Sequence, residues 1–326
     1  MRYDRAVLCL LCVLAAGAVA LAWTPDTRAA LGTSQALEIG KSGGMIEPRP
    51  SVELTVAPSF VIENARHVAN GEPLRNRASE GVQVSGVPVG REIVKALLYY
   101  NFSDLKEKGE PELPILFDGH KVIGELVADS ADPCWKLTGN HTYRFDVTDL
   151  ISAANPNREY AITTPFDLDT VTTGEDPWNT SVEPKVNNEG VTLIILYATD
   201  EPSMVLIYDE LPDSMFFERA RIELQHPMFS GMSLKGLLTM TGADGQTGRG
   251  HDTMVAGERG YLDSVQFSGP PVAPCDWDGS GRLPLSQLWD VHTRIVDLDG
   301  ESSTIEYEAN GDCLVPVAFV IETPVR

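Results

Sequence analysis

The sequence predicts an all-β fold, with one or two jelly-roll-like antiparallel β-sandwich modules after an N-terminal signal segment. Three observations support this prediction. Apolar and polar residues alternate with period two in many short stretches, which is typical of strands with one buried face. Gly, Pro and Asp separate these stretches at short intervals, as in sandwiches and jelly rolls. The chain shows no amphipathic pattern long enough for a helix of three turns.

The beginning of the chain, 1–22, has the pattern of a signal peptide. Two arginines precede an apolar run, and Ala18-Val-Ala20 and Ala20-Leu-Ala22 both suit cleavage by signal peptidase. An uncleaved membrane anchor is the alternative, because the run is close to the length that spans a bilayer. No second long apolar run follows, so we expect no other transmembrane segment. The predicted location is extracytoplasmic, either secreted or at the cell surface.

After the signal, 23–50 is rich in small residues, glycine and proline, which predicts a flexible arm. Two modules are expected beyond it, 51–210 and 211–326, although the second can also be the other half of one large β domain. Alternation and apolar runs predict the strands of the first module at 51–56, 81–89, 93–100, 115–117, 121–127, 142–147 and 159–163. The same patterns predict those of the second at 219–225, 234–241, 254–267, 291–297, 303–308 and 314–322.

Local signals also predict turns. Asp118-Gly119 lies between two predicted strands and suits a tight hairpin turn. A single helical turn is expected at 149–151, and the proline-rich 270–274 is expected to be part of a loop.

The most apolar stretch, 189–210, predicts a hairpin at the centre of the sandwich. It contains two runs of strand length, Val191–Ala198 and Met204–Tyr208, and between them the acidic, proline-containing Thr199–Ser203 suits a turn. Because the runs are almost continuously apolar, both faces of each strand are expected to be covered.

Composition limits the classes of partner. The 326 residues are 43% hydrophobic, which is enough for a substantial core. The formal net charge of −22 disfavours nucleic acid and anionic membrane surfaces, because both repel an acidic protein. Cations, basic proteins and neutral sugars remain as candidate partners, and a cell-surface glycan or protein is expected. The sequence leaves the oligomeric state open.

Three cysteines, Cys134, Cys275 and Cys313, follow the signal segment. Thiols tend to pair in an oxidising compartment, and three of them allow one disulfide with one cysteine left over. We predict the pair Cys275–Cys313, because both lie in the C-terminal part.

The best candidate metal site is the loop 276–281, where oxygen-bearing side chains alternate and end at a glycine. Asp276, Asp278 and Ser280 occupy the first, third and fifth positions of a calcium loop. The match then weakens, since Pro284 stands at the ninth position and Gln287 replaces the usual glutamate. An acidic turn without metal is the alternative. Calcium is therefore the predicted cofactor, on these three ligands alone.

Two tryptophans are candidate ligand-binding residues. Trp178 and Trp277 lie in predicted loops beside Asp and Asn, and aromatic rings next to such groups are suited to stacking on sugars. A structural tryptophan that closes the end of the sandwich is the alternative. The six histidines show no metal-ligand spacing, and the nucleophile motif Gly-x-Ser-x-Gly does not occur. No catalytic residue is predicted.

Six segments carry a resemblance to known proteins: 81–88, 94–100, 143–151, 190–197, 288–293 and 311–320. They resemble a family of secreted bacterial and archaeal surface proteins with a β-sandwich domain of unknown function. The resemblance implies an extracellular β protein with no established activity, and it provides no catalytic residue. The leading prediction is therefore a non-enzymatic cell-surface protein with a structural or adhesive role. A carbohydrate-binding module and, less favoured, an extracellular hydrolase are the alternatives.

Overall fold

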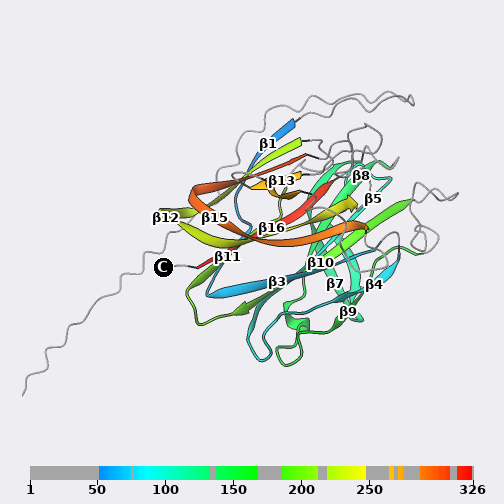
Figure 1. Ribbon diagram of the computed structural model, residues 1–326. Helices are drawn as coiled ribbons and strands as arrows, with labels where there is room; N and C mark the ends of the chain where they lie inside the picture. The colour runs from blue at the N-terminus through cyan, green and yellow to red at the C-terminus, as the bar shows by residue number, and fades with distance from the viewer. Residues whose placement is uncertain are drawn as a thin grey trace, which may run out of the picture. The chain divides into compact units, whose positions relative to one another are not determined.

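The computed structural model describes nine parts of the chain, all within one compact unit, Ile46–Arg326. These parts are 51–74, 77–132, 137–167, 185–211, 219–246, 264–267, 271–274, 287–308 and 314–324. They form two sheets and one 3₁₀ turn, η1 (Thr148–Leu150), so the all-β prediction is confirmed (Figure 1).

Sheet 1 has eight strands in the order β3-β10-β5-β8-β7-β6-β9-β4, and every neighbouring pair is antiparallel. Its strands are β3 (Ala65–Pro73), β4 (Ser79–Gln83), β5 (Ile93–Asp104), β6 (Glu112–Phe117), β7 (His120–Ala131), β8 (Gly139–Asp146), β9 (Glu159–Thr163) and β10 (Val186–Ala198).

Sheet 2 also has eight strands, in the order β14-β13-β15-β12-β16-β11-β2, with β1 paired in parallel to β12. Its strands are β1 (Ser51–Val56), β2 (Phe60–Glu63), β11 (Ser203–Tyr208), β12 (Arg219–Gln246), β13 (Ser264–Phe267), β14 (Pro271–Pro274), β15 (Gln287–Glu308) and β16 (Val315–Pro324). Three of them, β1, β2 and β11, come from the predicted first module. β1 pairs with β12 and β11 pairs with β16, both strands of the predicted second module, and β2 pairs with β11.

The tight turn between β6 and β7 is confirmed. Phe117 pairs with His120, and the two residues between them have positive φ, 51° at Asp118 and 80° at Gly119. Two residues with positive φ match the twist of an antiparallel pair, which is why Asp-Gly is a strong hairpin signal.

The predicted hairpin at 189–210 is wrong. β10 pairs with β3 and β5 in sheet 1, whereas β11 pairs with β2 and β16 in sheet 2. The connection at Thr199–Ser203 therefore crosses from one sheet to the other. Each strand is a covered central strand of its own sheet, and such a strand has the same apolar pattern whether its chain neighbour pairs with it or not.

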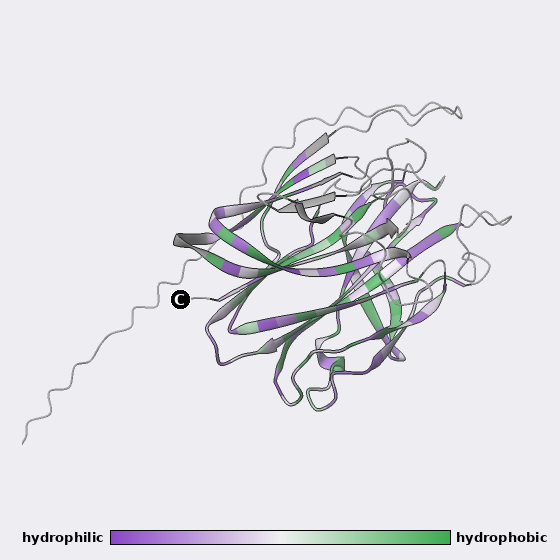
Figure 2. Ribbon diagram, viewed as in Figure 1, coloured by the Kyte–Doolittle hydropathy of each residue, from purple (hydrophilic) through white to green (hydrophobic). Residues whose placement is uncertain are grey.

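The long strands of sheet 2 replace several shorter predictions. β12 includes both 219–225 and 234–241, with shifts of register between Gln225 and Leu234. β15 joins 291–297 and 303–308 through Gly300, which has a φ of 70°. Figure 2 shows hydrophobic and hydrophilic residues alternating along β15. The segment 271–274 forms β14 against β13 instead of a loop, because prolines are tolerated on an edge strand.

Three hydrophobic clusters stabilise this arrangement. One lies on sheet 1 and includes Tyr100, Phe117 and Phe145, and a second lies on sheet 2 and includes Ile222 and Phe319. The third contains residues of both sheets and packs them together; its larger members are Leu97, Tyr99, Ile194, Leu196, Val205, Ile207, Trp289, Val317 and Val320. β5 and β10 contribute to the first and third clusters on opposite faces, which explains their nearly continuous apolar runs.

Trp289 anchors the contact between the sheets. It is fully buried on β15, and its indole Nε1 donates a hydrogen bond of 2.9 Å to Thr192 Oγ1 on β10. Its ring lies against Gly71 and Gly190, where an added Cβ would overlap it. These glycines have a packing role, because they let the backbone of sheet 1 approach the indole closely.

Candidate functional site

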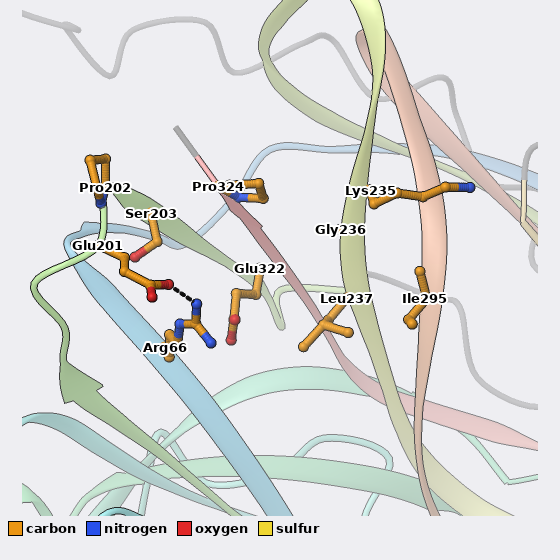
Figure 3. Close-up of a pocket in the computed structure, with 10 residues that line it drawn as sticks. All are labelled: Arg66, Glu201, Pro202, Ser203, Lys235, Gly236, Leu237, Ile295, Glu322 and Pro324. Atoms are coloured by element: carbon orange, nitrogen blue, oxygen red, sulfur yellow. Dashed lines mark hydrogen bonds and ion pairs between the residues drawn. The ribbon is translucent and has the colours of Figure 1, made fainter. Parts of the chain in front are cut away.

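A pocket of about 270 Å³ lies where β3 of sheet 1 meets β12, β15 and β16 of sheet 2 (Figure 3). The connection between β10 and β11 forms another wall. Its charged lining residues are Arg66, Glu201, Lys235 and Glu322, and the others are Pro202, Ser203, Gly236, Leu237, Ile295 and Pro324. The volume is slightly below that of pockets for drug-sized ligands, so it suits a small group.

Glu322 is the most buried charged group of this pocket, with a side chain that is only 10% exposed. Its Oε2 accepts a hydrogen bond of 3.0 Å from the backbone N–H of His67 and lies 2.8 Å from His67 Nδ1. No other described residue forms a hydrogen bond with its Oε1, and Figure 3 shows the carboxylate within the pocket. One carboxylate oxygen of Glu322 is therefore held by His67, and the other is available to a ligand in the pocket.

The environment keeps this carboxylate ionised. Burial alone would raise the pKa of Glu322, but the hydrogen bonds from the His67 ring and amide, with the nearby charge of Arg66, outweigh burial. The net effect lowers the pKa of Glu322 below its ordinary value. Glu322 is consequently negative at neutral pH.

A chain of hydrogen bonds continues behind the carboxylate. His67 Nε2 lies 2.7 Å from Thr239 Oγ1, which lies 2.7 Å from Thr293 Oγ1. In a neutral imidazole whose Nδ1 donates to Glu322, Nε2 accepts from the Thr239 hydroxyl. Carboxylate, imidazole and hydroxyl have the connectivity of an acyl-transfer triad. Here the Thr239 hydroxyl is fully buried and bonded on both sides, so the arrangement orients Glu322 instead of presenting a nucleophile.

The two cations of the pocket have acidic partners at its rim. Arg66 pairs with Glu201 across the opening, and both side chains are largely exposed. Lys235 Nζ lies 2.5 Å from Asp297 Oδ1, and Figure 3 shows its side chain directed away from Glu322. Exposed ion pairs of this kind contribute only about 0–1 kcal/mol, so either can rearrange around a ligand.

Three pocket residues form one row across adjacent strands of sheet 2. Leu237 on β12 is the direct partner of both Glu322 on β16 and Ile295 on β15. Direct partners point to the same face of a sheet and stand about 5 Å apart. The row therefore places a carboxylate at one end and two aliphatic side chains beside it.

Two of the buried polar networks that the described residues form outside the pocket centre on Asp209 and on His141. Asp209 is fully buried and accepts hydrogen bonds from Tyr99 at 2.6 Å, Arg144 at 2.7 Å and the Ser59 hydroxyl. Asp209 follows directly after β11 of sheet 2, so its contacts with Tyr99 and Arg144 join the end of β11 to β5 and β8 of sheet 1. All three donors converge on one carboxylate, so the buried charge of Asp209 has hydrogen-bonding partners from both sheets.

His141 is the centre of the other network. Its Nε2 lies 3.1 Å from Asp104 Oδ1, and its Nδ1 contacts Asp129 Oδ1. Burial lowers the pKa of His141, but the two carboxylates outweigh it and raise this pKa to about 9. The imidazolium is thus held between two anions inside sheet 1.

The residues that the sequence predicts as sites lie outside the described parts. This applies to the calcium ligands Asp276, Asp278 and Ser280, the tryptophans Trp178 and Trp277, and the disulfide Cys275–Cys313. Within the described parts, no cluster of three or more His, Cys, Asp or Glu side chains has metal-binding geometry. In the same parts, no helix has the length and apolarity needed to cross a membrane.

No sequence motif indicates the pocket. His67 and Glu322 are 255 positions apart, and neither belongs to a motif. A weak signal is present in β16, where Glu322 follows an apolar run and interrupts a buried strand. A charged residue inside such a strand needs a partner, but the sequence does not indicate which residue provides it.

Comparisons with known proteins give no family. No family model matches the chain, and no curated protein matches it. Among solved structures, the glycosylasparaginase PNGase F from Flavobacterium meningosepticum is 12% identical, with coverage of 82% of this chain and 96% of that one and a TM-score of 0.23. A structure of peptide-N(4)-(N-acetyl-beta-D-glucosaminyl) asparagine amidase is 14% identical, with coverage of 79% and 96% and the same TM-score of 0.23.

BuGH86 in complex with neoagarooctaose is also similar in part. It is 12% identical, and the match covers 81% of this chain and 33% of that one with a TM-score of 0.18. At these TM-scores, none of the likenesses supports a conclusion about activity.

Proposed function

We propose that this protein is a non-enzymatic β-sandwich protein with an adhesive role outside the cytoplasm, and that it binds a positively charged partner. The observation that carries the proposal is Glu322, a buried carboxylate with one oxygen fixed by His67 and the other available to the pocket. A preorganised anion of this kind favours a cation without having to rearrange. The signal segment and the family resemblance support the extracytoplasmic location.

Charge supports a basic partner. The formal net charge of −22 attracts positively charged proteins and speeds their encounter with the surface. Diffuse attraction is screened beyond about 8 Å at 0.15 M ionic strength, whereas a contact inside a pocket is screened much less. Binding that persists at this ionic strength is therefore expected of a specific site.

The bonding of His67 favours binding over catalysis. Both ring nitrogens are engaged, with Glu322 on one side and the buried Thr239 on the other. A general base for hydrolysis has to reach a nucleophile or a water at the substrate. His67 has a side chain that is 1% exposed, which leaves it no such access.

The experiment is retention of the purified protein on polylysine, polyglutamate and uncharged beads. We expect retention on polylysine alone at 0.15 M salt, with competition by a short lysine-containing peptide. Equal retention on all three matrices, or none on polylysine, contradicts a role in binding basic partners. Turnover on a panel of glycosides and esters contradicts the non-enzymatic part of the proposal.

A carbohydrate-binding module is the second candidate, because Trp178 and Trp277 stand beside polar residues suited to sugars. It predicts binding on a glycan array that is lost in Trp178→Ala or Trp277→Ala while the thermal unfolding temperature is kept. If the wild-type protein binds no glycan on a broad array, this candidate is eliminated.

A further inference from the structure

We infer that the pocket at Glu322 binds the side chain of a lysine, an ammonium group on an aliphatic stem, presented by a partner protein. The inference rests on the proposed function and assigns the chemical group that the pocket takes. The charge of Glu322, the row of side chains beside it and the size of the pocket support this assignment.

The ammonium position is set by Glu322. One of its oxygens is held by His67, and the other makes no hydrogen bond to any described residue. An ammonium group has three donors, so it can give one to this oxygen and keep the others for water or for the hydroxyl oxygen of the buried Ser203, which also lines the pocket. Hydrogen bonds between two charged groups are about twice as strong as neutral ones.

The stem position is set by Leu237 and Ile295. These residues continue the row that starts at Glu322, and Ile295 is 73% exposed. An exposed isoleucine beside a charged pocket is an apolar surface that a ligand can cover. Adjacent strands stand about 4.8 Å apart, so the row across three strands is about 9.6 Å long, which is more than enough to cover the four methylene groups of a lysine stem. Lysine stems commonly lie along apolar surface while the ammonium group stays in a polar site.

Arg66 modulates this site. Its charge acts on Glu322, and its guanidinium group is held at the rim by Glu201. The positive charge of Arg66 partly repels an ammonium group at Glu322. The ion pair with Glu201 holds the Arg66 guanidinium in this position. Removing the positive charge of Arg66 should therefore strengthen the binding of an ammonium ligand. The same change should weaken the binding of an anionic ligand, so the direction of the effect distinguishes a cationic from an anionic ligand.

The experiment measures affinity by calorimetry at 0.15 M salt. The probe is a short peptide with one central lysine, and its control is the same peptide with that lysine Nε-acetylated. The wild-type protein is expected to bind only the unmodified peptide. Cadaverine, a free alkylamine, is the second probe; equal or tighter binding of cadaverine assigns the pocket to a free amine and overturns the partner protein.

Four variants locate the binding. Glu322→Gln should weaken lysine-peptide binding by about tenfold or more, as expected for loss of a charged hydrogen bond. Ile295→Ser, at an exposed position, should weaken it roughly threefold by removing apolar contact. Arg66→Gln should strengthen it by about two- to fivefold. The exposed Glu112→Gln on β6 has the same change of charge outside the pocket and should have no effect.

The outcomes separate the two proposals. If the protein is retained on polylysine but Glu322→Gln and Ile295→Ser both bind the peptide as wild type does, the pocket assignment fails and the proposed function stands. If Arg66→Gln weakens the binding of the lysine peptide instead of strengthening it, Arg66 does not act there as a repelling charge and the pocket assignment fails. If the wild-type protein binds neither polylysine nor the peptide, the proposed function fails. If Glu322→Gln does not fold, the affinities of Ile295→Ser and Arg66→Gln for the lysine peptide still test the pocket assignment.

Discussion

His67 Nδ1 lies 2.8 Å from Glu322 Oε2, and this contact joins sheet 1 to sheet 2 across 255 positions of the chain. The backbone N–H of His67 donates to the same oxygen. The orientation of the pocket carboxylate thus depends on how β3 and β16 pack. The affinity of a ligand that binds Glu322 should therefore depend on how the two sheets pack.

Stability at acidic pH should depend on Glu322. Its pKa is lower in the folded protein than in the unfolded chain, so its contribution is present above the unfolded pKa of about 4.3 and is lost as the pH falls through the folded pKa. We expect Glu322→Gln to reduce the unfolding free energy at pH 7 by about 1–3 kcal/mol. Urea unfolding from pH 7 to pH 3 should show the two proteins converging in acid.

The control for this prediction is Glu112→Gln, which removes an exposed carboxylate with no described partner. It should follow the wild-type curve at every pH. If the difference in unfolding free energy between wild type and Glu322→Gln is constant from pH 7 to pH 3, the charge of Glu322 does not account for the effect.

The opposite pH dependence is expected at His141. Its pKa is raised to about 9, so its contribution is complete below the ordinary value of 6.5 and is lost as the pH rises through about 9. We expect the unfolding free energy to fall by roughly 3 kcal/mol between pH 6 and pH 9.5. Asp129→Asn removes one of the two carboxylates and should shift the titration of the His141 ring, followed by NMR, to lower pH. An unchanged titration would contradict the role of Asp129.

Local patterns were sufficient to predict most strands. Ser51–Val56 and Glu159–Thr163 have the predicted bounds, because alternation shows one buried face directly. The turn at Asp118-Gly119 was predictable since only a few residue types tolerate positive φ. Pairing was harder, as the wrong hairpin at 189–210 shows. Central strands are apolar on both faces, and their sequence does not record which strand lies beside them.

The site was less predictable than the fold. His67 and Glu322 meet only because two sheets pack face to face, and each residue looks ordinary within its own strand. Sequence motifs detect ligands that are close in the chain, such as the 276–281 loop, and cannot detect a pair separated by most of the protein. Buried charge in an apolar strand is the one local sign of such a pair.

Close packing around Trp289 predicts a large cost for small substitutions. An added Cβ at Gly190 would overlap the indole ring, so Gly190→Ala should reduce the unfolding free energy by about 1–3 kcal/mol. The measurement is urea unfolding. In a Trp289→Phe background the smaller ring leaves room, so the same substitution should cost less, and the difference is the coupling between the two positions. Equal costs in both backgrounds would show that Gly190 and Trp289 are independent.

Calcium binding is expected to stabilise the protein if Asp276, Asp278 and Ser280 act as ligands. Pro284 and Gln287 provide no carboxylate at the ninth and twelfth positions, so the affinity should be weak, near millimolar. A ligand that binds only the folded state adds about 2.7 kcal/mol at a hundredfold excess over its Kd, and less than 1.5 kcal/mol is therefore expected at about ten times Kd. At this tenfold excess, about 10 mM calcium, the thermal unfolding temperature should rise by a few degrees, at roughly 2–4 °C per kcal/mol. Magnesium should have a smaller effect, because it requires stricter octahedral geometry.

Asp278→Ala should abolish the calcium shift without changing the unfolding temperature in chelator. An equal shift in Asp278→Ala would place the calcium elsewhere, and no shift in the wild-type protein would leave 276–281 as an acidic turn.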